Sequence, residues 1–177
     1  MGIFNFFKKP IDSKEMIQLA QSWTNSFIEF QENELKLSKP EVFMFYSWKV
    51  WDYFNNYYKL SNAKQISEIF FQAVYKIAFP NNEISFENFT IDYNYFRVEL
   101  YKIKIERFFN SDFHNNYTLL ELFNLFHKDE FNLNSLKMSE LSSNFLEADK
   151  MHLLTEFTEN FKLDWDLTTK ELLTKYK

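Results

Sequence analysis

Residues 41–60, EVFMFYSWKVWDYFNNYYKL, decide the fold of this chain. Between Phe43 and Tyr58 this stretch carries nine aromatic side chains in sixteen residues. At about 100° per residue on a helix, most of its apolar residues share one very wide arc. A helix of this kind is normally surrounded by other elements, so it is predicted to be the central helix. The arc holds Phe43, Met44, Tyr46, Val50, Trp51, Tyr53, Phe54, Tyr57 and Tyr58.

The narrow remaining edge of the same helix is predicted to be polar. Phe45 lies within this edge and Trp48 lies at its border. We favour the interpretation that another segment covers these two rings. The alternative is an exposed aromatic anchor for a partner protein, since binding hot spots favour such rings. The polar residues of the edge are Glu41, Lys49, Asp52, Asn56 and Lys59.

Amphipathic helices are predicted on both sides of the aromatic stretch. Asp12 and Glu15 have the spacing of a capping box, and the helix that they start is expected to run to about residue 35. Its core-facing stripe is Met16, Leu19, Ala20, Trp23, Phe27 and Phe30. A third helix is expected to start at Asn62 and to end before Pro80, with an apolar stripe of Ala63, Ile66, Phe70, Ala73, Val74 and Ile77.

The second half of the chain is also predicted to be helical. Residues 84–110 are ambiguous, and we expect a helix from about Asp92 with room for a short extended piece before it. Further helices are expected at 118–126, at 143–161 and from Thr168 onward, with a break at Trp165. The chain is therefore predicted to be an all-α, single-domain bundle of about six to seven helices. Residues 1–10 form a Phe-rich arm, and 11–177 form the helical domain.

The arm, MGIFNFFKKP, has two interpretations. It docks on the domain, which we favour, or residues 1–9 touch a membrane surface. Docking is favoured because so short an apolar segment binds a membrane weakly by itself.

The composition excludes several classes of site. The single glycine rules out the glycine-rich loops that hold phosphates and dinucleotides. The absence of cysteine rules out disulfides, thiolate catalysis and cysteine-based zinc sites. The net charge is −5 and the lysines are scattered, so nucleic-acid binding is not expected. No apolar run approaches the roughly 18 residues of a membrane span, and a cytoplasmic location is expected.

One constellation of polar residues stands out, formed by Asp149, His152, Glu156 and Glu159. Their spacing places all four on one helix face. Three interpretations are open: a solvated acidic face, which we favour, an acidic surface for a basic partner, and a metal site. A di-metal centre needs matching ligands from other helices, which the sequence does not offer. Therefore no metal and no other cofactor is expected.

Arg97 is one of only two arginines. If its helix is packed on two sides, the guanidinium needs a carboxylate partner, because an unpaired buried charge is very costly. A structural ion pair is favoured over recognition of an anion.

No enzyme motif is found. The sequence favours a non-catalytic protein that binds another protein with a basic surface, as inhibitor-type or immunity-type proteins do. The first alternative is a helical bundle that encloses a small apolar or aromatic ligand. The second is a metal-dependent enzyme that uses the Asp149/His152 face.

Overall fold

A computed structural model of the protein describes residues 11–30, 37–58, 60, 62–93, 97–110, 126 and 151–176. These residues form six α-helices and one π-helix, and no strand occurs among them. The predicted all-α bundle is confirmed. The elements are α1 (Ser13–Phe30), α2 (Lys39–Asp52), η1 (Tyr53–Tyr58), α3 (Ala63–Ala78), α4 (Phe86–Asp92), α5 (Val98–Asn110) and α7 (Met151–Lys175).

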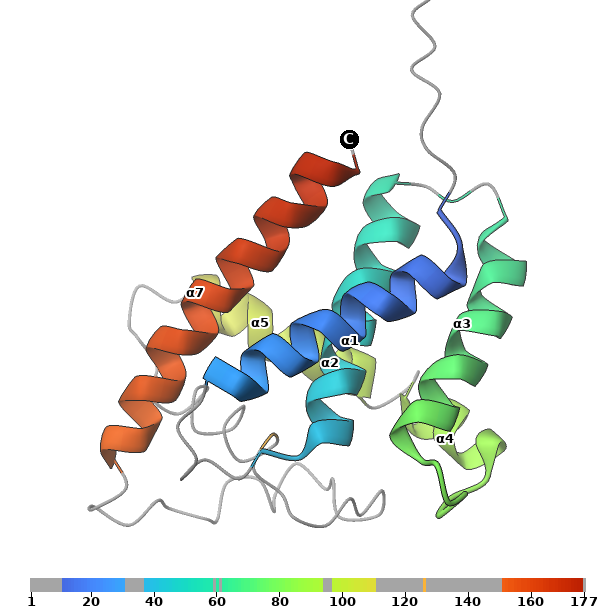
Figure 1. The fold of residues 1–177 in the computed structure, drawn as a ribbon, viewed down its shortest axis with the longest axis horizontal. Coiled ribbons are helices and arrows are strands. Elements are labelled where there is room, and N and C mark those ends of the chain that lie inside the picture. The colour runs from blue at the N-terminus through green and yellow to red at the C-terminus, as the bar shows by residue number, and fades with distance from the viewer. Residues whose placement is uncertain are drawn as a thin grey trace, which may run out of the picture.

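Helix α2 lies at the centre of the arrangement. In Figure 1, α1 crosses in front of α2, with α7 on one side and α3 on the other, and α1 contacts all three. Helix α4 packs against α3. Helix α5 lies on α2 through the rings of Phe45 and Tyr101, whose centroids are 5.3 Å apart. The prediction of a central aromatic helix is therefore confirmed.

The burial of α2 goes further than its sequence pattern predicts. Every residue from Glu41 to Val50 is buried, including the charged side chains of Glu41 and Lys49. The predicted polar edge is therefore buried at these two positions. α5 and α7 cover the edge, and each supplies polar partners for the charge that it buries.

At its C-terminal end α2 continues into the π-helix η1. Tyr57 was expected within the buried arc, but its ring is exposed. A π-helical turn contains more residues than an α-helical one, so the residues beyond Tyr53 no longer follow the 100° spacing. Phe54 and Tyr58 remain buried, and Tyr57 turns to solvent with its ring stacked on that of Tyr53 at 5.9 Å.

Helix α1 starts where its cap predicts. The backbone N–H of Glu15 donates to Oδ1 of Asp12 over 2.8 Å. The Glu15 side chain also accepts a hydrogen bond from the Tyr176 hydroxyl, which ties the start of α1 to the end of the chain. The predicted stripe is buried except at its last member, Phe30, which is 64 % exposed at the end of the helix.

Of residues 84–110, the stretches 86–93 and 97–110 are helical. The extended piece considered before Asp92 is not found, because Phe86–Asp92 forms α4. Ser85 starts this helix by accepting a hydrogen bond from the Asn88 N–H over 3.1 Å. Between α3 and α4, Asn82 takes a positive φ of 55°, a conformation that asparagine adopts more readily than most residues.

Helix α7 is one continuous helix, so the predicted break at Trp165 and restart at Thr168 are wrong. The hydroxyl of Thr168 does not cap a new helix. It donates back to the Asp164 carbonyl over 2.7 Å, and the hydroxyl of Thr169 donates to the Trp165 carbonyl over 2.6 Å. Such bonds satisfy threonine inside a helix, which is why a cap-like sequence is not a reliable boundary.

Several predictions fall on residues outside the description. These are the arm at residues 1–10, the end of the first helix near residue 35, the helix at 118–126 with the exception of Phe126, and residues 143–150 of the helix predicted at 143–161. The ring of Phe126 is fully buried, and its carbonyl accepts a hydrogen bond from the Ser38 N–H at the start of α2.

Candidate functional site

Helix α7 divides into a buried face and a solvent face. Phe157, Phe161, Leu172 and Tyr176 are buried and point to the core. The Phe27 ring of α1 lies edge-on to Phe157 and Phe161, at 6.0 and 6.1 Å. Figure 1 shows α7 along one side of the molecule, with its other face turned outward.

The solvent face carries the strongest candidate for a binding surface. Six of its residues fall within about 100° of arc at helical spacing. At the middle of this outer face, Leu163 and Leu167 are 51 % and 55 % exposed. Carboxylates surround the two leucines, and one lysine lies toward the C-terminal end of the helix. The outer face of α7 consists of Glu156, Glu159, Leu163, Asp166, Leu167 and Lys170.

Two of the four predicted acidic-face residues belong to this surface. Glu159 is exposed and Glu156 is half-buried. Asp149 lies outside the described residues, and of His152 only the helical backbone is described. Sequence reasoning did not connect these carboxylates to Leu163 and Leu167, because the expected break at Trp165 interrupted the face.

Phe45 and Trp48 do not form an exposed aromatic anchor. Both rings are buried. Trp48 packs between Tyr101 of α5, at 5.7 Å, and Trp165 of α7, at 6.4 Å. Phe45 lies edge-on to Phe126 at 5.1 Å. These contacts agree with the favoured interpretation that other segments cover both rings, and the covering elements include α5 and α7.

Arg97 lies in a buried polar cluster between α2 and α5. Its Nε donates to Oδ2 of Asp92 over 2.6 Å, and its Nη1 donates to Oε2 of Glu41. The Tyr101 hydroxyl donates to the other oxygen of Glu41. Burial raises the pKa of the Glu41 carboxyl, against the opposing effect of Arg97. The guanidinium is thus held in an ion pair inside the protein and does not face an anion site.

Lys49 is a buried charge that the sequence pattern places on the polar edge of the central helix. Its Nζ donates to the Trp165 carbonyl over 2.9 Å and to the Thr168 hydroxyl over 2.6 Å. Burial lowers the pKa of this amine to about 7, although Asp164 and Asp166 act in the opposite direction. Next to it, the Tyr46 hydroxyl donates to Asp164. These groups join α2 to α7 by polar contacts within an otherwise aromatic core.

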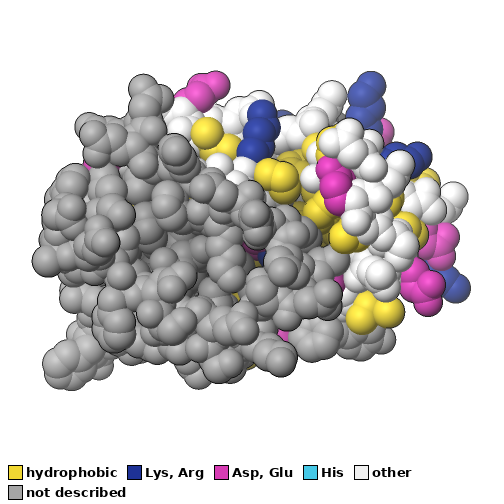
Figure 2. Space-filling model, turned by 90° about the horizontal axis from the view of Figure 1, so that it is seen from below, with side chains coloured by type: hydrophobic (Ala, Val, Ile, Leu, Met, Phe, Trp, Pro, Cys, Tyr) yellow, Lys and Arg dark blue, Asp and Glu magenta, His cyan; other side chains and the backbone are white. Residues whose placement is uncertain are grey.

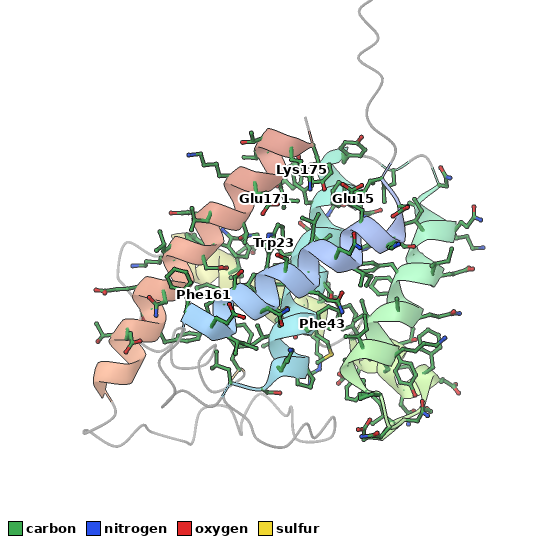
Figure 3. All side chains as sticks on the ribbon, viewed as in Figure 1. Glu15, Trp23, Phe43, Phe161, Glu171 and Lys175 are labelled. Carbon is green, nitrogen blue, oxygen red and sulfur yellow. The ribbon has the colours of Figure 1, made fainter. Side chains whose placement is uncertain are left out.

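A polar groove of about 500 Å³ runs between α1 and the end of α7, open to solvent. Figure 3 shows Glu15, Glu171 and Lys175 around the space between the two helices. The carboxylates here have protein partners: Glu171 accepts from the Trp23 indole N–H over 2.8 Å, and Glu15 lies 3.9 Å from the Lys175 amine. We interpret the groove as a solvent-filled gap between α1 and α7, bordered by the polar contacts that hold the two helices together.

Within the described part of the chain, no group of three or more histidine and carboxylate side chains is placed to hold a metal ion. None of the described helices combines the length and apolar character needed to cross a membrane. No protein-family model, curated protein or solved structure matches this chain.

Proposed function

We propose that this protein is a non-catalytic binding protein, and that the outer face of α7 contacts a partner protein with a basic surface. The observation that carries the proposal is the pair Leu163 and Leu167, exposed at the centre of a helix face among Glu156, Glu159 and Asp166. An apolar centre within a charged rim is the arrangement typical of protein-binding surfaces.

The fold gives these two leucines no role in the core. Helix α7 is held by its opposite face, through Phe157, Phe161 and Leu172. Single exposed apolar residues are common and need no explanation. Two leucines one turn apart on the same face form a small contiguous apolar surface, which a partner can cover at a gain of roughly 25 cal/mol per Å² of apolar area.

The charge of the surface indicates what kind of partner it fits. The outer face carries three carboxylates against one lysine, and the whole chain has a net charge of −5. Opposite charge on a partner speeds association and sets orientation more than it adds affinity. A basic protein with an apolar patch is therefore the best match. The protein would block or hold that partner, as inhibitor-type proteins do. We propose that the two proteins meet in the cytoplasm.

The experiment identifies the partner and then measures its binding. The wild-type protein is crosslinked in extracts of its own source cells, and the captured protein is purified. Its association and dissociation rates are measured by biolayer interferometry at low and high salt. Two double variants are compared with wild type: E156K/E159K, which reverses two rim charges, and L163S/L167S, which removes the apolar centre.

The charge reversal is expected to slow association about tenfold at low salt and to weaken its salt dependence. The leucine substitutions are expected to speed dissociation by at least tenfold. The matched control is E68K/E83K, which makes the same charge change at exposed positions on and just after α3. An acidic partner, outer-face variants that bind as wild type does, or a control that loses as much binding would each overturn the proposal.

A further inference from the structure

A second surface feature lies on the opposite side of the molecule, along α3. Ile66, Ile69, Ala73 and Ile77 share one face of this helix within about 80° of arc. Ile66, Ala73 and Ile77 belong to the apolar stripe that the sequence assigns to the core, whereas Ile69 lies outside that predicted stripe. The prediction is wrong at Ile77, which is 39 % exposed, and Ile69 beside it is 53 % exposed. Ile66 and Ala73 are half-buried at the edge of the core. The described residues thus leave part of this stripe in contact with water.

The exposed stripe ends in a groove of about 380 Å³. The groove lies where α1, the start of α2 and the end of α3 meet, and its surface is mainly apolar. Figure 2 shows hydrophobic side chains at the surface on the α3 and α4 side of the molecule, among charged ones. The lining is formed by Gln21, Thr24, Asn25, Lys39, Pro40, Phe43, Ile77, Ala78 and Pro80.

We infer that residues 3–7 of the chain, IFNFF, pack along this α3 stripe and into the groove at its end. This contact is separate from the proposed partner surface on α7.

The composition of residues 3–7 is the first argument. Residues 3–7 contain four large apolar side chains, Ile3, Phe4, Phe6 and Phe7. Burying each of them is worth roughly 1.5–3 kcal/mol relative to exposure, so the segment gains most on an apolar surface.

Reach is the second argument. Ile11 is buried in the core and fixes the point from which the segment extends. Residues 3–7 lie four to eight positions before it, so an extended chain places them about 13–28 Å away. Along α1, Gln21 and Thr24 lie ten and thirteen residues beyond Ile11, at about 15–20 Å. The segment therefore reaches the groove if it runs back beside α1.

Connectivity is the third argument. A segment joined to the domain by a few residues has an effective concentration in the millimolar range or above near its site. A separate partner or a second copy of the chain would have to compete with a tethered apolar segment. The attached segment is therefore the favoured occupant of this stripe.

The absence of natural cysteine makes a direct test possible. One variant carries F6C with I77C, and the control carries F6C with L167C on the outer face of α7. Both are treated with a short bismaleimide crosslinker, and the crosslinked product is sized and mapped by mass spectrometry. The F6C/I77C pair is expected to crosslink within one chain at least tenfold faster than the control pair.

A second measurement does not depend on crosslinking. In a chain with I77C alone, the alkylation rate of the thiol is expected to rise several-fold when Phe4, Phe6 and Phe7 are changed to serine. The same change should leave an L167C thiol unaffected. Circular dichroism checks that the helices are retained, and I69C replaces I77C if that variant does not fold.

Equal crosslinking of the two pairs would overturn the inference, as would an alkylation rate that the serine changes leave unaltered. Crosslinks between chains only would assign the stripe to a second copy. Loss of binding to anionic lipid vesicles in the serine variant, without any protection of I77C, would assign the segment to a membrane surface. Either result would also overturn the inference.

Discussion

The amine of Lys49 on α2 lies 3.6 Å from the ring centre of Trp165 on α7 and 2.9 Å from the carbonyl oxygen of the same residue. The lysine thus contacts both the backbone and the indole of one tryptophan. This contact lies on the predicted polar edge of α2, at the point where the sequence pattern predicts, wrongly, a break in α7.

Lys49 is expected to make stability depend on pH. Its pKa falls from 10.5 in the unfolded chain to about 7 in the folded protein, mainly through burial. Between these values the unfolded state binds more protons, so the free energy of unfolding rises with pH. From pH 7 to pH 9 the gain is expected to be about 2 kcal/mol.

Urea unfolding at several pH values checks this, with K49M as the comparison. The variant should lose the rise between pH 7 and pH 9, and it should not be less stable than wild type at pH 7. When the Lys49 amine is removed, the Trp165 carbonyl is still hydrogen-bonded, because it also accepts from the Thr169 hydroxyl. A steep rise that persists in K49M would show that another group titrates in this range.

Removal of Arg97 is expected to be strongly destabilising. Arg97→Met leaves the buried carboxylates of Glu41 and Asp92 without their cation, which typically costs about 3–5 kcal/mol. The loss should grow as pH rises from 5 to 8. Without the arginine, burial raises the pKa of both carboxyls without the opposing effect of its charge. The folded variant then holds protons that the unfolded chain has released, so its free energy of unfolding falls as the pH rises.

The control is an exposed ion pair on α5, a few residues after Arg97. Lys102 is 3.8 Å from Glu99 on α5, and both side chains are about half exposed. Lys102→Met is expected to change the free energy of unfolding by less than about 1 kcal/mol. Thermal and urea unfolding of the two variants would contradict the account if their losses were similar.

Phe27 and Phe30 form a matched pair within α1. Both belong to the stripe predicted from the sequence, but the ring of Phe27 is buried and that of Phe30 is 64 % exposed. Phe27→Ala is expected to cost about 3–5 kcal/mol, because it removes a ring that contacts α2 and α7 and leaves a cavity. Phe30→Ala should cost less than about 1 kcal/mol. Equal losses in urea unfolding would mean that Phe30 is covered in solution.

Ser47→Ala is expected to stabilise the protein or leave it unchanged. The Ser47 hydroxyl is fully buried in α2 and has no hydrogen-bond partner among the described residues. A buried hydroxyl without a partner costs about 1–3 kcal/mol, and alanine also has the higher helix propensity. The control is Thr24→Ala, which removes a hydroxyl that donates to the Ala20 carbonyl over 2.7 Å. Differential scanning calorimetry should give the higher Tm for Ser47→Ala, and a large loss there would reveal a partner.

The candidate surface was only half visible in the sequence. The spacing of Glu156 and Glu159 places them on one helix face without any structure. Leu163 and Leu167 join that face only because α7 continues past Trp165, and nothing local marks this continuation. The two aspartates and two threonines around Trp165 resemble a helix boundary. Asp164 instead accepts a hydrogen bond from the Tyr46 hydroxyl, and the hydroxyls of Thr168 and Thr169 donate to carbonyls of the preceding turn.

By itself, the sequence determined the all-helical class, the central place of residues 41–50 and most helix starts. Hydrophobic periodicity and capping act over a few residues, so they can be read along the chain. Only the tertiary structure decided that Glu41 and Lys49 are buried, that Tyr57 and Phe30 are exposed, and that Phe45 and Trp48 are core residues. Each of these depends on which distant helix covers a given face. The polar partners that make it possible to bury charge lie about 50 to 120 residues away in the chain.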